Sequence, residues 1–164
     1  MGVSLCINNG TLITPHGALR CSVAIGEGKI LALQTEEAVG LRGCAEVIDA
    51  KGKMVLPGVI DVHVHLEDVG SDGTPTADDF YDGTKSAAWG GTTCVIDFVT
   101  PDPGEGLTAA LRRRRSAAER GSVVDFGFHM CITQNWRDEI DEVEEVLRSG
   151  VPSFKAFTTY QGLE

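Results

Sequence analysis

The spacing of apolar residues along the chain changes near residue 57. Before that point, short apolar runs alternate with turn signals such as Asn8-Asn9-Gly10 and Gly26-Glu27-Gly28. Regularly spaced short strands joined by such turns are typical of antiparallel β-structure. We therefore expect residues 1–56 to form the N-terminal part of a small β-sandwich domain.

After residue 57, apolar strands alternate with helical stretches, which is typical of parallel βαβ units in a doubly wound sheet or a barrel. No glycine-rich phosphate fingerprint follows the first strand, which disfavours a nucleotide-binding sheet. We therefore predict an α/β fold in which residues 57–164 form the first four strands of a (β/α)8 TIM-like barrel. The expected strands are residues 59–65, 92–99, 123–132 and 153–160, and the expected helices are residues 77–89, 106–120 and 136–148.

Composition narrows the function classes. A net charge of −10 over 164 residues disfavours a nucleic-acid or anionic-membrane surface. No stretch is apolar enough to span a bilayer. The basic run from Arg112 to Arg115 is interpreted as the solvated face of a helix. The five cysteines are odd in number and form no C-x-x-C pair, so we expect reduced core residues in a cytoplasmic protein rather than a disulfide or zinc framework.

Two histidines one residue apart end the first strand predicted after residue 57. Residues i and i+2 of a strand point to the same face, so the imidazoles of His63 and His65 can reach one metal ion. The strand before them is apolar apart from Asp61, and buried polar side chains need partners, which a metal ion supplies. A strand end with solvent-facing histidines is the simpler alternative.

Lys155 stands between two phenylalanines in the last predicted strand, which suggests a lysine inside a barrel or core. Desolvation favours the neutral, nucleophilic form of a lysine amine. Such an amine can capture carbon dioxide and become a carbamate, an anionic ligand with two oxygens that can bridge two metal ions. The alternative is a lysine whose stem crosses the core and whose ammonium group reaches water.

The functional residues of (β/α) barrels lie at the C-terminal ends of the strands. His63 and His65 end the first strand, and Lys155 and Tyr160 lie on the fourth, so we expect them to converge on one cavity. His129 lies on the third strand and is interpreted as a core histidine rather than a ligand. A complete barrel takes about 250 residues, so the chain is expected to be an N-terminal fragment or a truncated product.

Four ordered motifs resemble the N-terminal portion of the hydantoinase and dihydropyrimidinase group of cyclic amidohydrolases, and in particular its phenylhydantoinase type. The resemblance covers essentially the whole chain. The matching stretches are residues 56–65, residues 76–80 with 83–88, residues 90–98, and residues 150–160.

The resemblance implies a zinc-dependent hydrolase that opens the ring amide of hydantoins or dihydropyrimidines. By this resemblance His63 and His65 would bind the more buried of two Zn²⁺ ions, and a carbamylated Lys155 would bridge both. Tyr160 would hydrogen-bond the substrate and the developing oxyanion, and Asp61 would support the ligands from behind. The implied partners are a small cyclic amide and, in the complete enzyme, further copies in a homotetramer.

The chain departs from the group in two places. Glu67-Asp68-Val69-Gly70 stands where many members carry a Met-Pro-Phe-like stretch in the loop over the substrate. This stretch and Thr159-Tyr160-Gln161 resemble the phenylhydantoinase type, which argues against dihydrouracil as the substrate. The group's two later metal-binding histidines and its catalytic aspartate come from strands beyond Glu164. The resemblance therefore implies that this chain alone is inactive.

Two alternatives remain open. An allantoinase or a dihydroorotase shares the paired histidines and the lysine, although residues 76–80 favour the hydantoinase side. A non-enzymatic scaffold related to dihydropyrimidinases keeps the fold but loses metal ligands, and the presence of His63, His65 and Lys155 argues against it.

Overall fold

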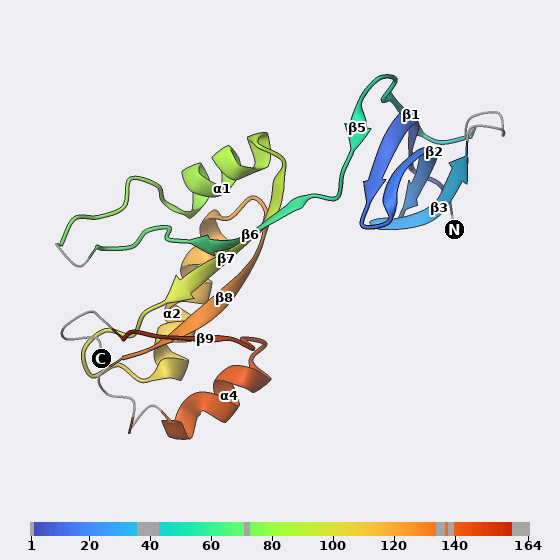
Figure 1. Ribbon diagram of the computed structural model, residues 1–164. Helices are drawn as coiled ribbons and strands as arrows, with labels where there is room; N and C mark the ends of the chain where they lie inside the picture. Colours follow the sequence, from blue (N-terminus) through green and yellow to red (C-terminus); the bar gives the residue numbers. More distant parts are fainter. Residues whose placement is uncertain (1, 36–42, 71–72, 134–136, 138–139, 159–164) are drawn as a thin grey trace. The chain divides into compact units, whose positions relative to one another are not determined.

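The computed structural model describes residues 2–35, 43–70, 73–133, 137 and 140–158. The chain divides into two compact units, Met1–Pro57 and Gly58–Glu164. The first unit is a mixed β-sheet, and the second is a parallel sheet with helices (Figure 1). Across the described ranges, no helix combines the length and the apolar character that crossing a membrane requires.

In the first unit, five strands form one sheet in the order β3-β2-β1-β4, with β5 beside β1. Strands β1, β2 and β3 pair antiparallel, whereas β4 and β5 run parallel to β1. The turn predicted at Asn8-Asn9-Gly10 is wrong, because these residues lie within β1, where the register with β2 shifts. Glu27 and Gly28 join β2 to β3 with φ angles of 53° and 71°, which suit a tight hairpin. The sandwich as a whole stays a prediction. The strands are β1 (Leu5–Thr14), β2 (Gly17–Gly26), β3 (Lys29–Thr35), β4 (Glu46–Asp49) and β5 (Met54–Val55).

A disulfide joins Cys6 to Cys44, so the expectation that all cysteines are reduced is wrong for this pair. The pairing of Leu5 with Glu46 brings β1 beside the start of β4, and the two Cα atoms lie 6.0 Å apart. A separation of 38 residues in the sequence gave no sign of this proximity. The other cysteines are free thiols, and burial raises the pKa of each: Cys21, Cys94 and Cys131.

In the second unit, four strands form a parallel sheet in the order β6-β7-β8-β9. This result confirms the predicted alternation of strands and helices in an α/β unit. The elements are β6 (Val59–Val64), α1 (Phe80–Trp89), β7 (Thr92–Val99), α2 (Leu107–Gly121), β8 (Asp125–Ile132), η1 (Ile140–Glu142), α4 (Val143–Arg148) and β9 (Phe154–Ala156).

The helices of the second unit differ in extent from the prediction. Helix α1 begins at Phe80 rather than at residue 77, because the Asp79 carboxylate accepts a hydrogen bond from the backbone N–H of Asp82 at 2.7 Å and caps the helix. The expected helix over residues 136–148 is described as the 3₁₀ turn η1 followed by the short helix α4. Its predicted start at Trp136 lies outside the described residues.

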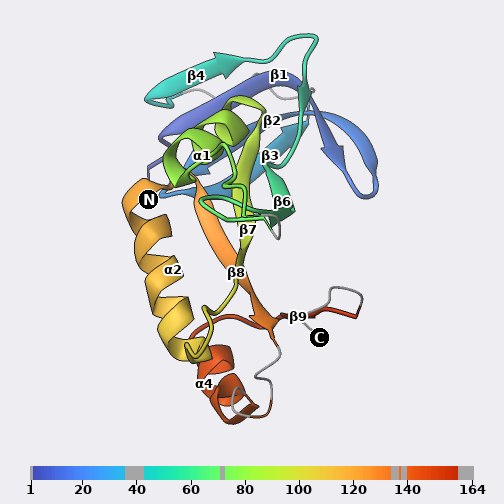
Figure 2. The ribbon, with the colours of Figure 1, turned by 90° about the vertical axis from the view of Figure 1, so that its left-hand side faces the viewer.

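Successive side chains of β7 point to opposite sides of the sheet. Val95 and Val99 are buried in a core with Leu107 and Leu111 of α2 and Val146 of α4. Figure 2 shows α2 and α4 along this side of the sheet. Phe98 alternates with these valines and points to the other side, where the candidate site lies.

Candidate metal centre

Strand β6 contains one extra residue relative to β7 just before the paired histidines. Asp61 pairs with Val95 and Val64 pairs with Asp97, so the register shifts between them. A carboxylate oxygen of Asp61 accepts a hydrogen bond from the backbone N–H of His63 at 3.1 Å. Asp61 therefore holds the bulged backbone that presents the first histidine. The supporting role predicted for it stays a prediction.

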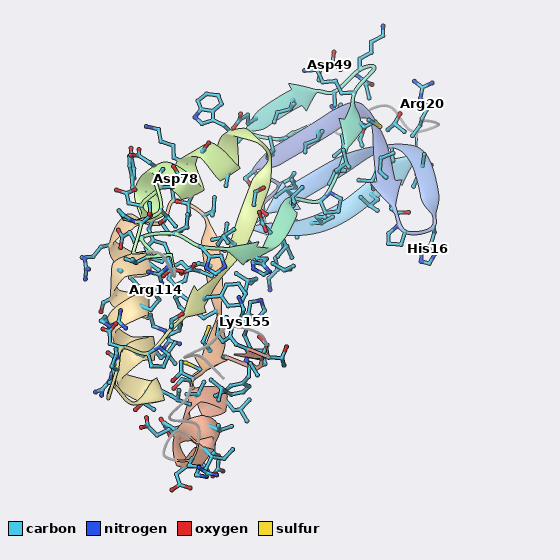
Figure 3. All side chains as sticks on the ribbon, turned by 60° about the vertical axis from the view of Figure 1, so that its left-hand side comes forward. His16, Arg20, Asp49, Asp78, Arg114 and Lys155 are labelled. Carbon is cyan, nitrogen blue, oxygen red and sulfur yellow. A yellow bond between two sulfur atoms is a disulfide. The ribbon has the colours of Figure 1, made fainter. Side chains whose placement is uncertain are left out.

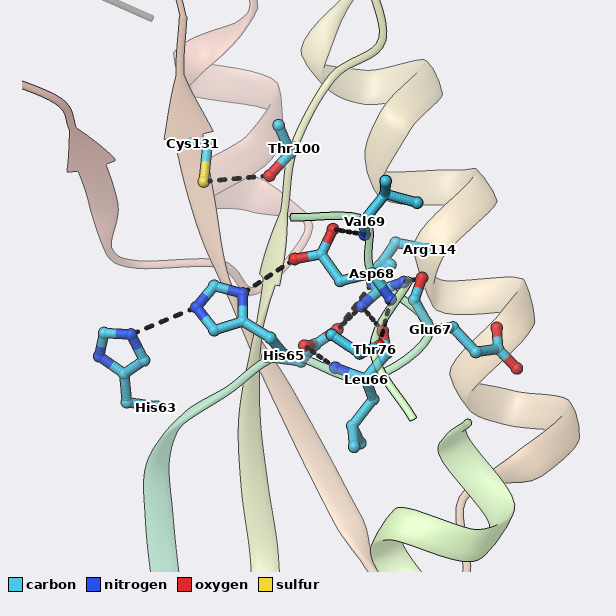
Figure 4. A network of polar contacts seen from close by, with 11 residues as sticks. His63, His65, Leu66, Glu67, Asp68, Val69, Thr76, Thr100, Arg114 and Cys131 are labelled. Carbon is cyan, nitrogen blue, oxygen red and sulfur yellow. Dashed lines mark hydrogen bonds and ion pairs between the residues drawn. The ribbon is translucent and has the colours of Figure 1, made fainter. Parts of the chain in front are cut away.

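The two imidazoles face each other. Their Nε2 atoms lie 3.3 Å apart, and Figure 4 marks this contact with a dashed line. Two nitrogens bound to one tetrahedral zinc ion at about 2.0–2.1 Å are themselves about 3.3 Å apart. Asp68 Oδ2 lies 2.9 Å from Nδ1 of His65, which orients this ring and leaves its Nε2 as the nitrogen for a metal ion. The spacing and the donor atoms of His63 and His65 fit a shared zinc ion.

Phe98 is the common neighbour of the candidate residues. Its ring centre lies 4.6 Å from that of His63, 4.8 Å from that of His65 and 5.1 Å from that of His129. The ring of His65 is stacked on it, with 12° between the planes. Because Phe98 is only 6% exposed, it gives these polar rings a fixed apolar support.

Lys155 lies on β9 opposite Cys131 of β8. Its ammonium nitrogen is 4.2 Å from the ring centre of Phe98 and 4.9 Å from that of Phe157. The structure thus brings Lys155 to the same aromatic ring as both histidines. Lys155 and Arg114 are labelled on opposite sides of the parallel sheet in Figure 3.

His129 uses both of its ring nitrogens within the fold. Nε2 lies 2.9 Å from the carbonyl oxygen of Val62, and Nδ1 lies 2.5 Å from the hydroxyl oxygen of Ser153. A histidine with both nitrogens hydrogen-bonded offers no lone pair to a metal ion. This geometry supports the interpretation of His129 as a structural residue.

The site is incomplete within the described part of the chain. No group of three or more His, Cys, Asp or Glu side chains there is arranged to hold a metal ion. The predicted contact of Tyr160 with substrate falls outside the described residues. His63, His65 and Lys155 are therefore the predicted site residues that the structure brings together.

Two features of the site escaped sequence reasoning. Asp68 lies in the stretch that departs from the group and no role was predicted for it, yet it holds the ring of His65. The arginine run was interpreted as a solvated face, but Arg114 is only 8% exposed and pairs with the fully buried Asp97. An acidic residue in an apolar strand was the available signal, because a buried carboxylate needs a cationic partner. Burial raises the pKa of Asp97, and the hydrogen bond from Arg114 opposes that rise.

Most of the sequence matches a known family. A model of the amidohydrolase family matches residues 54–159. The chain belongs to the amidohydrolase family. Its similar proteins include hydantoinases and dihydropyrimidinases, which confirms the resemblance inferred from the four motifs.

Three amidohydrolases show the extent of the similarity. The chain is 40% identical over 157 residues to a D-hydantoinase of Geobacillus stearothermophilus, covering 94% of this chain and 32% of that protein. It is 40% identical over 166 residues to dihydropyrimidinase 2 of Caenorhabditis briggsae, covering 98% of this chain and 31% of that protein. The crystal structure of a dihydropyrimidinase from Brevibacillus agri matches with a TM-score of 0.82 at 36% identity, covering 95% of this chain and 33% of that chain. The chain spans about a third of the length of the curated relatives it matches.

Proposed function

We propose that this chain supplies the first metal ligands of a zinc-dependent hydrolase that opens the ring amide of hydantoins or dihydropyrimidines. The observation that carries the proposal is the 3.3 Å separation of the Nε2 atoms of His63 and His65. The carboxylate of Asp68 on the outer nitrogen of His65 supports it, because metal-binding histidines commonly donate their second N–H to such a group. Membership of the amidohydrolase family supports it independently.

Each residue has a distinct role in this proposal. His63 and His65 would hold one zinc ion, and Lys155, as a carbamate, would supply an anionic ligand for a second. Bound zinc supplies Lewis acidity, which lowers the pKa of water and polarises an amide carbonyl. Phe98 keeps the rings and the lysine amine in place, and its apolar surface limits water around them. Tyr160 donates a hydrogen bond to the substrate oxygen as negative charge builds on it.

The remaining parts of the site are assigned to downstream strands. A closed (β/α)8 barrel would bring two further histidines and the aspartate that acts as general base to the same ends of the strands. Loss of a general base typically costs about 10²–10⁴-fold in rate, so the 164-residue chain alone should show no measurable hydrolysis. A cytoplasmic location, a homotetramer and the phenylhydantoinase type stay predictions from the resemblance.

A substrate panel tests the proposal. A protein that carries this chain together with the downstream barrel strands is assayed on 5-phenylhydantoin, dihydrouracil, allantoin and dihydroorotate. We expect ring opening of 5-phenylhydantoin to be fastest, and Lys155→Ala to abolish it. Faster turnover of allantoin or dihydroorotate would assign the chain to one of those enzymes instead. A protein that binds zinc but opens none of the rings would contradict a hydrolase function.

A further inference from the structure

A buried ion pair lies behind the candidate metal centre, on the helix side of the sheet. The Nε atom of Arg114 on α2 lies 2.6 Å from Oδ2 of Asp97 on β7. Asp97 is fully buried and the Arg114 side chain is 10% exposed. Such a pair is costly to desolvate, so the remaining hydrogen-bonding atoms of both side chains need partners.

Those partners are the backbone groups of the two residues that follow His65. Arg114 donates to the carbonyl oxygen of Leu66 and, at 3.1 Å, to that of Glu67. Asp97 Oδ1 accepts from the backbone N–H of Leu66 at 3.3 Å. The pair therefore binds this short segment through both a donor and an acceptor, as Figure 4 shows in part.

The segment needs such an anchor because its backbone is unusual. Strand β6 ends at Val64, and Glu67 has a φ of 44°, a left-handed conformation that non-glycine residues rarely adopt. An observed backbone outlier persists only where the surroundings hold it. Directly after it, Asp68 reaches back to Nδ1 of His65 at 2.9 Å. The conformation at Glu67, together with the hydrogen bonds between Asp68 and Thr76, thus directs the Asp68 carboxylate toward the histidine ring.

The geometry points to Asp97 and Arg114 as positioning residues for metal binding, which act by clamping residues 66–67 so that Asp68 orients His65. Neither residue contacts the metal ion in this arrangement. The inference rests on the proposed metal site at His63 and His65. It differs from a purely structural role, because it requires that the effect of Arg114 on metal affinity pass through Asp68.

A double-mutant cycle separates a positioning role of Arg114 in metal binding from a purely structural role. Arg114→Lys keeps the positive charge beside Asp97 but loses the planar fork that reaches two carbonyl oxygens. The affinity of the 164-residue chain for Co²⁺, a spectroscopic substitute for zinc, is measured by absorption titration for wild type, Arg114→Lys, Asp68→Asn and the double variant. Thermal unfolding of each variant reports the folded fraction.

We expect Arg114→Lys and Asp68→Asn each to weaken Co²⁺ binding by about 10–100-fold, as loss of a group behind a ligand typically does. The double variant should be little weaker than either single variant, because both changes remove the same support. Arg112→Lys is the matched control, since the Arg112 side chain donates to a carbonyl oxygen of its own helix, that of Thr108. Additive losses, or binding by Arg114→Lys as tight as the control, would overturn the inference.

The design also distinguishes failure of the clamp from failure of the metal site. If wild type binds Co²⁺ no better than the double variant His63→Ala/His65→Ala, the result contradicts both the proposed metal site and the positioning role. Amide hydrogen exchange of Leu66 then reports whether the clamp exists at all. Its N–H is bonded to Asp97, so Arg114→Lys should speed its exchange by about tenfold or more if the segment opens locally. Unchanged exchange would show that Arg114 does not hold the segment.

Discussion

His129 on β8 is bonded to Val62 on β6 across the strand between them. Its Nε2 lies 2.9 Å from the Val62 carbonyl oxygen, and β7 separates the two strands in the sheet. Nε2 donates to this carbonyl oxygen, which can only accept, and Nδ1 forms a hydrogen bond with the Ser153 hydroxyl at 2.5 Å. The carbonyl belongs to the bulged segment of β6 that leads into His63, which gives His129 a structural reason to lie beside the proposed metal ligands.

We predict that His129→Phe lowers the unfolding free energy by about 1–3 kcal/mol, because it removes two hydrogen bonds and leaves the Val62 carbonyl without its donor. Ser153→Ala removes only one of them and should cost about 1 kcal/mol. Urea unfolding of both variants provides the measurement. Zinc affinity lost from His129→Phe in a protein that remains as stable as wild type would instead make His129 a ligand.

The contact between η1 and α2 predicts an acid-dependent loss of stability. The Glu142 carboxylate accepts hydrogen bonds from the hydroxyl of Thr108 at 2.5 Å and from its backbone N–H at 2.8 Å. Both hydrogen bonds lower the pKa of Glu142, and the one from the Thr108 hydroxyl has the larger effect. A carboxyl with a lowered folded-state pKa stabilises the fold above its unfolded pKa of about 4.3. That contribution is lost as the pH falls through the folded-state pKa.

Glu142→Gln should therefore flatten the decline of unfolding free energy below roughly pH 4.5. Urea unfolding at a series of pH values measures this decline. Glu144→Gln is the matched control, because the Glu144 side chain is 74% exposed on the neighbouring helix turn. If the curves of wild type and Glu142→Gln run parallel from neutral to acid pH, the contact does not form in solution.

Strand β6 should cause the isolated chain to associate. Ile60 and Val62 alternate along this edge strand and are 60% and 61% exposed. An apolar face on an edge strand is a template for pairing with another chain. We expect Ile60→Lys/Val62→Lys to reduce the apparent mass in sedimentation experiments. Val123→Lys, at a similarly exposed valine outside the strands, should leave the mass unchanged. Equal association of the two variants would place the contact elsewhere.

Thiol counting tests the disulfide. With Cys6 bonded to Cys44, the denatured chain should present only the thiols of Cys21, Cys94 and Cys131 to a thiol reagent. Prior reduction should raise the count to all five cysteines. The chain must be purified without exposure to oxidants, so that oxidation during handling does not create the bond. Five reactive thiols before reduction would show that the pair is open.

Local patterns predicted the parallel sheet because its strands are apolar and its helices amphipathic. The paired histidines were equally visible, since residues i and i+2 share a face of any strand. The roles of Asp68 and Arg114 could not be predicted from the sequence pattern, because each depends on a contact with the short segment that follows β6. The bond of Arg114 to Leu66 spans 48 residues, and no local period encodes such a distance.

The Cys6–Cys44 pair illustrates the same limit. Its proximity follows from the parallel pairing of β1 with β4, which a strand pattern alone does not fix. The start of α1 was also missed, because the cap at Asp79 competes with a helical continuation through the preceding residues. Sequence periodicity thus indicated which elements form, whereas long-range polar contacts decided how the site is supported.

Metal analysis of the 164-residue chain tests the central claim most directly. The chain is loaded with zinc, dialysed against metal-free buffer and compared with His63→Ala and His65→Ala. We predict at most one weakly held zinc ion per chain, and less in either variant, because two imidazoles alone bind more weakly than a complete ligand set. Zinc retention that is unaffected by removal of His63 and His65 would contradict the account, and so would two tightly held ions in a monomeric chain.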